Sequence, residues 1–516
     1  MGDLSYTLAF PLAKVLKKAP KEIARKIVTE FPSHISPEVT RLEIGGNGYL
    51  NFWLNRAAIA REIYHTPVAP AKARDEKAIV EHTNINPNKA AHVGHLRNAC
   101  LGDTLVRLLR YSGVRVEVQN YIDDTGVQLA DVVVGLQRKG KSIQDLDEIP
   151  GKLDYYFWNL YAETHSWLEE SPENKSFREP VLKEMEDRTE PTYSLSQAIA
   201  DRIIRRHLKT MGRLGIGYQL LPRESDIIGR KFWQRTFELL RQKDAIVRVE
   251  EGKNKGCWIM RLTESEEFEE MQNPDKIIVR SNGTVTYVGK DIAYQLWKFG
   301  LLGLDFHYHV FDTQPDGTIL WTTSTHAENT APPRFGGADL VYNVIDQRQS
   351  YLQKVVAEGL RALGNEKQAE RSIHFAYEMV TLSPKTAAAL GFALSAEEQE
   401  RSFLEMSGRK GVGVKADDLL DRLESAAWQR ISGLYSDLEE EELQKLAADV
   451  AAGALRYFMV RYTRNTIITF DMEEALNFEG ETGPYLQYST VRGRSIFRKL
   501  SQAGFDLNKV KSHDFL

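Results

Sequence analysis

One stretch, residues 78 to 124, limits the possible folds more than any other part of the chain. It begins with the apolar run Ala78–Val80, and a polar loop rich in Asn and Pro follows. Apolar residues at helical spacing then predict a helix that starts near His92 and ends at Gly113. A second strand is indicated where valines alternate with polar residues over 114–119. This strand–helix–strand order predicts a parallel sheet, whose ligands bind where strand ends meet helix N-termini.

Two histidines, His92 and His95, stand three residues apart in the first turn of the predicted helix and therefore share one face. Gly94 removes a side chain where a phosphate or a flat ring could approach the backbone, and Lys89 adds a positive charge. A helix N-terminus favours an anion, so these parts suit a nucleoside triphosphate. The alternatives are a metal pair and a hydrogen-bonded core pair. A structural zinc site normally takes four ligands, and no third ligand lies at metal-like spacing, so no metal site is predicted.

Composition predicts a cytoplasmic protein of several domains. The 516 residues are 42% hydrophobic and 27% charged, with a net charge of −5. No apolar run approaches the ~18 residues that a membrane span needs, and the N-terminus lacks the order of a signal peptide. Only Cys100 and Cys257 are present, which fits a reducing compartment. Basic clusters lie within 14–26, 202–213 and 492–499; each alone is typical of a solvated helix face.

Three later segments carry polar groups where ligands could bind. Tyr287 is predicted to close a strand and Asp291 to open a helix; such a pair can bind a guanidinium, although Asp291 could equally be a helix cap. Gln349 follows the buried run 340–345, again at the carboxyl end of a predicted strand. The loop 407–411 offers movable positive charge, but such a loop is also common on protein surfaces.

The motifs in these segments resemble a known family. EHTNINPNKAAHVGHLRNACLGD contains a form of the "HIGH" motif of class I aminoacyl-tRNA synthetases, and together with NYIDDTGVQ it is similar to arginyl-tRNA synthetases. The resemblance implies an α/β fold: a Rossmann-like parallel sheet split by a helical insertion, a small α+β N-terminal domain and a helical C-terminal region. The expected parts are an RNA-elbow-contacting domain at 1–66, catalytic halves at 67–130 and 276–365, the insertion at 131–275, a stem at 366–435 and the start of the anticodon-binding domain at 436–516.

The resemblance also implies roles for individual residues. Those expected to bind arginine are Asn84, Ile85, Asn86, His95, Asn120, Tyr287, Asp291 and Gln349. Those expected to bind ATP are Lys89, His92, Gly94, His95 and Lys410. The expected catalytic set is Lys89, His92, His95, Ser407, Arg409 and Lys410. Tyr49 and Asn51 are the candidates for contact with the RNA elbow.

The loop at 405–411 departs from the second family motif, "KMSKS", because Glu405 and Gly408 stand where lysines are expected. Arginyl-tRNA synthetases that lack the second lysine carry one before the HIGH motif instead, and Lys89 is in that place.

The implied reaction forms arginyl-adenylate from arginine and ATP with Mg²⁺, and then transfers arginine to tRNA(Arg). A monomer is expected. Most of the anticodon-binding domain is expected to be missing from these 516 residues. The alternative is therefore a shortened paralogue that activates or transfers an amino acid without full tRNA recognition.

Overall fold

The computed structural model describes residues 2–30, 37–65, 71–262, 275–328, 331–404, 413–433 and 438–505, in two compact units. The larger unit, Lys72–Val491, is built on a seven-stranded sheet in the order β10-β11-β6-β5-β4-β12-β13. All neighbouring strands run parallel except β10 and β11. This confirms the predicted α/β class. The strands span Lys77–Glu81 (β4), Arg115–Gln119 (β5), Leu220–Leu221 (β6), His307–Thr313 (β10), Ile319–Ser324 (β11), Leu340–Asn343 (β12) and Ser372–His374 (β13).

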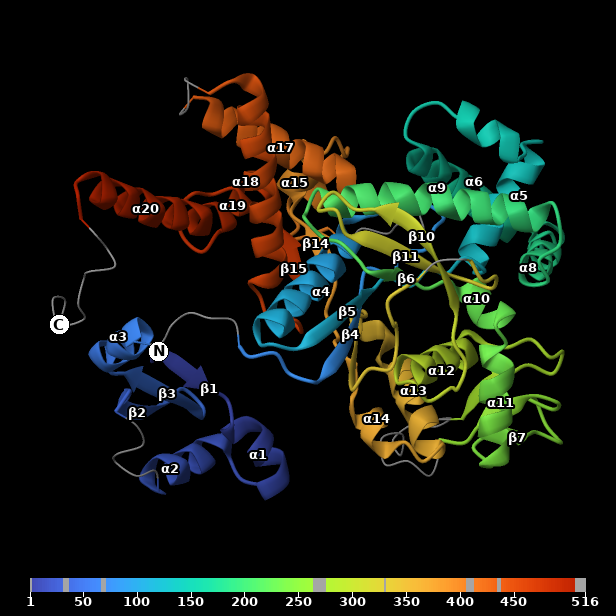
Figure 1. Ribbon diagram of the computed structural model, residues 1–516, viewed down its shortest axis with the longest axis horizontal. Helices are drawn as coiled ribbons and strands as arrows, with labels where there is room; N and C mark the ends of the chain where they lie inside the picture. The colour runs from blue at the N-terminus through green and yellow to red at the C-terminus, as the bar shows by residue number, and fades with distance from the viewer. Residues whose placement is uncertain are drawn as a thin grey trace. The chain divides into compact units, whose positions relative to one another are not determined.

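Helices cover both faces of this sheet (Figure 1). Helix α4, Val93–Tyr111, follows β4 as predicted, and its apolar side shares a buried cluster with Val80 and Val118. Helices α12, Tyr287–Lys298, and α13, Ser350–Ala362, pack with Ile79 and Val341 in a second cluster. Successive strand residues face opposite sides, so the continuous apolar run in β4 supplies both cores.

The segment after β5 is helical, as expected for the insertion. It contains α5 (Val127–Arg138), the 3-10 helix η1 (Ile143–Glu148), α6 (Leu153–Glu170), α7 (Pro172–Lys175), α8 (Arg178–Glu186) and α9 (Thr192–Gly212). The chain then rejoins the main sheet briefly at β6 before α10 (Glu224–Gly229) and α11 (Phe232–Gln242).

The prediction that the main sheet resumes at residue 276 is wrong. Strand β9, Lys276–Val279, joins β7 (Val247–Arg248) and β8 (Trp258–Met260) in a separate antiparallel sheet. The alternating pattern that indicates a strand does not say which partner it pairs with. Asn282-Gly283, a dipeptide typical of hairpin turns, forms a turn with φ of +87° at Gly283, but only an isolated bridge between Val279 and Val285 follows it.

The rest of the larger unit is mainly helical. It comprises α14 (Glu366–Glu370), β14 (Val380–Leu382), α15 (Pro384–Ala389), α16 (Ala396–Gln399), α17 (Ala416–Ser432), α18 (Glu440–Val460), β15 (Ile468–Phe470), α19 (Met472–Ala475) and α20 (Gly483–Gln502), whose last turns belong to the other unit. Strands β14 and β15 pair in parallel.

The fully buried Arg97 of α4 ties the signature helix to this region. Its guanidinium donates to the carbonyls of Glu378, Met379, Thr463, Arg464 and Thr466 at 2.6–3.5 Å. One side chain therefore satisfies carbonyls from two separate segments.

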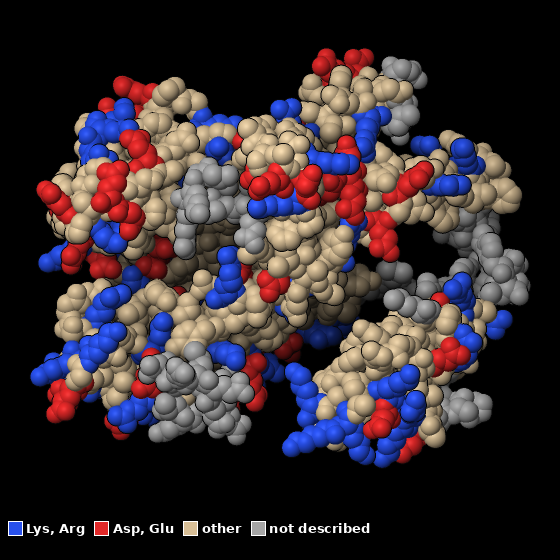
Figure 2. Space-filling model, turned by 180° about the vertical axis from the view of Figure 1, so that it is seen from behind, with Lys and Arg blue, Asp and Glu red and all other residues tan. Residues whose placement is uncertain are grey.

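The smaller unit has a three-stranded antiparallel sheet in the order β1-β3-β2, formed by Leu4–Tyr6, Tyr49–Leu54 and Val39–Gly45, with α3 at Arg56–His65. Two helices, α1 (Ala9–Leu16) and α2 (Pro20–Glu30), lie between β1 and β2 in the sequence. They are separated because Lys17 takes a left-handed φ of 51° and Pro20 begins the next helix. Figure 2 shows basic side chains gathered over this unit. Across the described ranges, no helix is long and apolar enough to cross a membrane.

Candidate active site

A strained turn at the carboxyl end of β4 begins the site. Thr83 and Asn84 have φ of +78° and +43°, which is unusual for residues with a side chain, above all for a β-branched one. The Thr83 N–H donates to Oδ1 of Asn98 at 2.5 Å, and the Thr83 hydroxyl bonds to that of Tyr218 at 2.7 Å. The surrounding structure therefore holds the conformation, as is common where a backbone aims a functional side chain.

The turn places Asn84 where its hydrogen bonds connect the ends of two strands. Its amide donates to Oε1 of Glu81 at 2.7 Å and accepts the N–H of Tyr121 at 2.9 Å, while its own N–H donates to Oδ1 of Asn120 at 2.9 Å. Glu81 ends β4, and Asn120 follows β5. Asn84 is thus held at the ligand side of the sheet.

Asn84 lines a cavity of about 140 Å³ at this edge of the sheet, together with Asp291. The other lining residues are Glu81, Tyr121, Tyr294, Gln295, Lys298, Asn343, Ile345, Gln353 and Val356. Lys298 binds Oε2 of Glu81 at 2.5 Å and the Asn343 amide oxygen at 2.9 Å. The volume suits a small ligand, and the polar groups converge on it from β4, α12 and β12.

The electrostatics of the cavity centre on Asp291. Burial, followed by repulsion from Glu224 and Glu81, raises the pKa of Asp291 to about 7, although Lys298 and Lys290 oppose the shift. Among the described residues, no ion pair or hydrogen bond engages the Asp291 carboxylate. A cation that entered the cavity would therefore meet a carboxylate ready to ionise.

Glu224 is the nearby acid that stays ionised. Burial opposes its ionisation, but Lys290 at 2.7 Å and hydrogen bonds from Thr125 and Tyr121 hold the pKa of Glu224 below its usual value. Glu224 does not line the cavity itself, but its negative charge helps to raise the pKa of Asp291.

Two predicted arginine contacts lie outside this cavity lining. Tyr287 is 53% exposed, with its ring centroid 5.4 Å from the Lys276 ammonium, and Gln349 is exposed at the end of the 3-10 helix η3, Gln347–Gln349. The secondary-structure prediction for 287–291 is wrong: both Tyr287 and Asp291 lie within α12, whose N-cap is Thr286. The helix-cap alternative for Asp291 is therefore excluded, and the roles of Tyr287 and Gln349 stay predictions.

The loop residues between β4 and α4 differ in exposure. Ile85 is buried among the core side chains, Asn86 is half-buried, and Asn120 is buried. Of these three, Asn120 accepts a hydrogen bond from the Asn84 N–H, whereas none lines the cavity itself. Their binding of arginine stays a prediction.

The two signature histidines stack at the start of α4. Their ring centroids lie 3.6 Å apart at 20°, and the His92 N–H donates to Nδ1 of His95 at 3.1 Å. Burial, then the charge of Lys89, lowers the pKa of His92 to about 3; burial and the His92 ring lower the pKa of His95 as well. Both imidazoles are thus neutral hydrogen-bonding groups at neutral pH.

Position 94 requires glycine because a neighbouring side chain fills the space beside it, not because a ligand must approach there. A Cβ there would lie 3.1 Å from Cε1 of His92, so the histidine ring itself occupies the space. The metal-pair alternative gains no support, because the described residues contain no group of three or more His, Cys, Asp or Glu suited to a metal ion.

Lys89 is buried beside aromatic rings, with its ammonium 4.9 Å from the centroid of Tyr161 and 5.4 Å from that of Trp158. Its carbonyl bonds Nε2 of His207 in α9 at 2.7 Å. Ser407, Arg409 and Lys410 lie outside the described residues. In the smaller unit, Tyr49 packs edge-on against Phe10, and Asn51 accepts a hydrogen bond from Ser5.

Sequence reasoning missed Glu81, Glu224 and Lys298. One signal was present: Lys290 and Lys298 are charges on the otherwise apolar side of α12, where a buried lysine needs an acid partner. The acid partners, Glu224 and Glu81, come from distant segments, so the local sequence pattern does not identify them.

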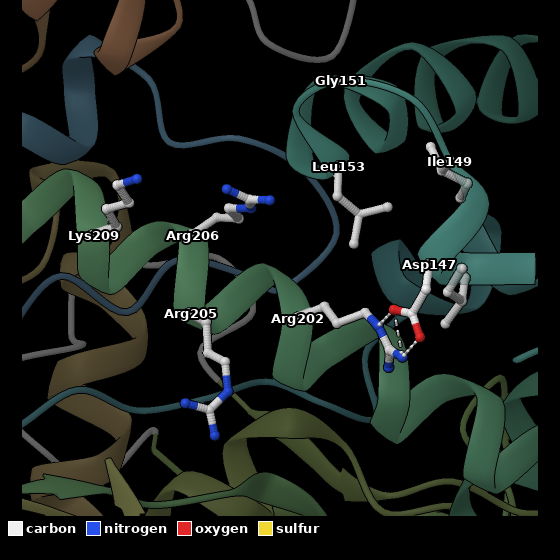
Figure 3. Close-up of a pocket in the computed structure, with 9 residues that line it drawn as sticks. Asp147, Ile149, Gly151, Leu153, Arg202, Arg205, Arg206 and Lys209 are labelled. Atoms are coloured by element: carbon white, nitrogen blue, oxygen red, sulfur yellow. Dashed lines mark hydrogen bonds and ion pairs between the residues drawn. The ribbon is translucent and has the colours of Figure 1, made fainter. Parts of the chain in front are cut away.

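A larger hollow of about 500 Å³ lies against α9 (Figure 3). It is lined by the basic residues Arg202, Arg205, Arg206 and Lys209 of α9 and by residues that include Asp147, Ile149, Gly151 and Leu153. Asp147 binds Arg202, and Asp312 binds Arg205 at 2.7 Å, whereas no ion pair engages Arg206 or Lys209 in the described parts of the chain.

Comparisons with known proteins cover the whole chain. Residues 61–316 match the family model of tRNA synthetases class I (R), catalytic domain, and residues 1–54 match that of the arginyl tRNA synthetase N terminal domain. The arginine–tRNA ligase of Thermococcus sibiricus is 37% identical over 100% of this chain and 79% of its own length. That of Pyrococcus abyssi is 38% identical over 97% of this chain and 77% of its own.

Solved structures agree with these relatives. The arginyl-tRNA synthetase of Thermus thermophilus superimposes with a TM-score of 0.73 at 33% identity, over 99% of this chain and 79% of that one. The arginyl-tRNA synthetase of Plasmodium falciparum, at 16% identity and a TM-score of 0.60, shares the fold.

Proposed function

Because the chain belongs to the arginyl-tRNA synthetase family, we propose that it is an arginine–tRNA ligase that forms arginyl-adenylate from ATP and transfers arginine to tRNA(Arg). The observation that carries the proposal is the acidic cavity at the carboxyl end of the sheet, where the Asp291 carboxylate has no described partner. A guanidinium presents a rigid fork of donors that matches a carboxylate.

The signature helix begins from the same strand end, after the loop that follows β4. We assign the ATP triphosphate to this helix N-terminus, with the ammonium of Lys89 and neutral His92 and His95 as donors. Groups fixed in this way stabilise charge that develops on the phosphates without themselves exchanging protons. Mg²⁺ would enter with ATP as part of the substrate.

Specificity in this proposal comes from burial. A ligand that lacks the guanidinium leaves the buried Asp291 carboxylate without a partner, and unpaired buried polar groups discriminate strongly. Rejection of other amino acids then needs no editing domain.

For tRNA, the hollow along α9 supports a phosphate-binding surface. Arg206 and Lys209 have no described anionic partner, and His207 between them bonds the carbonyl of Lys89. The surface would thus lie next to the catalytic loop. Contact of Tyr49 and Asn51 with the RNA elbow remains part of the same proposal, as do the monomeric state and the cytoplasmic location.

The test is arginine-dependent exchange of pyrophosphate with ATP, measured with and without tRNA(Arg), followed by aminoacylation. We expect exchange with arginine but not with lysine or citrulline. The close relatives support the ligase over a shortened paralogue; exchange at full rate without tRNA and no aminoacylation would reverse that choice.

The RNA surface has its own test. Replacing Arg206 and Lys209 together with Ala should weaken tRNA binding, and the slope of log affinity against log salt should fall by about two because two phosphate contacts are lost. Arginine binding should not change. The control is Lys183→Ala with Arg235→Ala, which removes equal charge elsewhere.

A further inference from the structure

The side-chain amide of Asn98 connects the signature helix α4 to its surroundings. Asn98 stands three residues after His95, so the two side chains share one face of the helix. It is 5% exposed. Its Oδ1 accepts the Thr83 N–H, and its Nδ2 donates to the Val344 carbonyl at 2.7 Å and to the Tyr377 hydroxyl at 3.0 Å. Both donor hydrogens of the amide and its oxygen therefore have partners.

Two of these partners adjoin the walls of the cavity. Thr83 directly precedes Asn84, and Val344 stands between Asn343 and Ile345. The three residues Asn84, Asn343 and Ile345 all line the cavity. One amide from α4 thus fixes a backbone group beside the wall that follows β4 and another within the wall that follows β12.

These contacts continue the link between the two neighbouring strands. The ladder between β4 and β12 pairs residues as far as Glu81 and Asn343, and the Val344 N–H then donates to the Glu81 carbonyl at 2.9 Å. Beyond that bond the chain turns at Thr83 with a left-handed φ of +78°. The Asn98 amide bridges the Thr83 N–H and the Val344 carbonyl at this point, where the regular pairing has ended.

The same helix carries the groups assigned to ATP. His92 and His95 lie at its start, within two turns of Asn98. The amide therefore sets where the start of α4 stands relative to both walls of the arginine cavity.

Formation of the adenylate depends on that distance. An arginine carboxylate oxygen bonds to the α-phosphorus of ATP while the bond from this phosphorus to the bridging oxygen breaks, and pyrophosphate leaves with the electron pair. The reacting atoms must first come within about 3–3.5 Å of each other in line, and an error of ~1 Å can cost on the order of 100-fold in rate. Binding each substrate in its own place is not sufficient.

We propose that Asn98 is a positioning residue that sets the distance between arginine in the cavity and ATP at the start of α4. The inference rests on the proposed function and adds to it a residue that touches neither substrate. An amide suits this role because it offers two donors and one acceptor on a short, stiff side chain, and these match two carbonyl or hydroxyl oxygens and one N–H.

The experiment compares Asn98→Ala with the parent in pyrophosphate exchange, with tRNA(Arg) present. We expect kcat to fall about 100-fold because the substrates are no longer aligned. KM for arginine and for ATP should each stay within about threefold, because the contacts to each substrate remain. Thr83 keeps its bond to Tyr218, and Asn84 keeps its bonds to Glu81 and Asn120.

Asn98→Asp gives a second, pH-dependent readout. A protonated carboxyl can accept from the Thr83 N–H and donate to the Val344 carbonyl, whereas a carboxylate cannot donate. Burial raises the pKa of a carboxyl, so kcat relative to the parent should rise about tenfold or more as pH falls from 8.5 to 6.5. The same ratio for Asn98→Ala should stay flat.

Asn174→Ala is the matched control. It removes an amide that donates to the Trp167 carbonyl at 2.9 Å in the insertion, and kcat should equal that of the parent. The inference is wrong if Asn98→Ala keeps the parent kcat, or if it raises both KM values and leaves kcat unchanged. If Asn98→Ala does not fold, a flat pH ratio for Asn98→Asp overturns the inference and a rising ratio supports it. Failure of the parent protein to form arginyl-adenylate would instead refute the proposed function.

Discussion

Lowering the pH from 8 to 6 should weaken arginine binding by protonating Asp291. The pKa of this carboxyl is raised to about 7 by burial and by the charges of Glu224 and Glu81, against the pull of Lys298 and Lys290. The guanidinium of arginine stays charged throughout, and only the ionised carboxylate can accept both of its hydrogen bonds.

The size of the effect follows from the fraction ionised. With a pKa of about 7, the apparent Kd is multiplied by about 1.1 at pH 8, about 2 at pH 7 and about 11 at pH 6. Affinity should therefore fall roughly tenfold over this interval, or ~1.4 kcal/mol. Below pH 6 each further unit should cost another factor of about ten.

Calorimetric titration with arginine measures both parts of this linkage. Binding at pH 6 should release about 0.9 proton, seen as a dependence of the heat on the ionisation enthalpy of the buffer, and almost none at pH 8.5. Asp291→Asn should bind arginine about 100-fold or more weakly, with a nearly flat profile, because the charged partner is gone.

The control is Asp316→Asn, which removes a carboxylate that only caps the exposed turn at Thr318. Its binding profile should match that of the parent. Proton uptake on binding, or a parent profile that is flat from pH 8 to 6, would refute the assignment of Asp291 as the guanidinium carboxylate.

Three further predictions concern the same framework. The pKa of Asp291 is raised in the folded state, so its protonated form stabilises the fold and this contribution is lost as pH rises through 7. Asp291→Asn should therefore raise the free energy of unfolding at pH 8 by on the order of 2–4 kcal/mol but change it little at pH 4. Thermal melts at both pH values would show this difference. Gly94→Ala should displace the His92 ring and slow pyrophosphate exchange about 10–100-fold while calorimetry finds arginine binding intact; normal exchange would mean that the ring adjusts at no cost. Arg97→Lys should lower the free energy of unfolding in urea by about 3 kcal/mol, since an ammonium cannot satisfy the carbonyls that the guanidinium now reaches, and an unchanged melt would contradict that account.

The sequence predicts those elements whose pattern is local, within a few neighbouring residues, and fails where the structure depends on distant segments. The unit β4–α4–β5 matches its prediction within about two residues, because helical spacing, alternation and the stop at Gly113 are local properties. The two-residue strand β6 has no pattern long enough to be seen. The helical placement of Tyr287 and Asp291 was missed because the apolar spacing of α12 begins before the residue taken as its start.

The candidate site divides in the same way. Asn84, Asp291 and the histidine pair were found from motifs, and the structure brings Asn84 and Asp291 to one cavity. Glu224 was missed because its effect on Asp291 depends on a loop that returns to the sheet far along the chain. A local sequence pattern does not show which charged residues from distant segments come close together around the cavity.

Arg97 stands two residues beyond His95 and is anchored in carbonyls of two separate segments, 378–379 and 463–466. A helix is stiff along its axis, so a shift of either segment should move the first turn of α4 with it. Such a displacement would therefore reach His92 and His95, whose rings stack at the start of that helix.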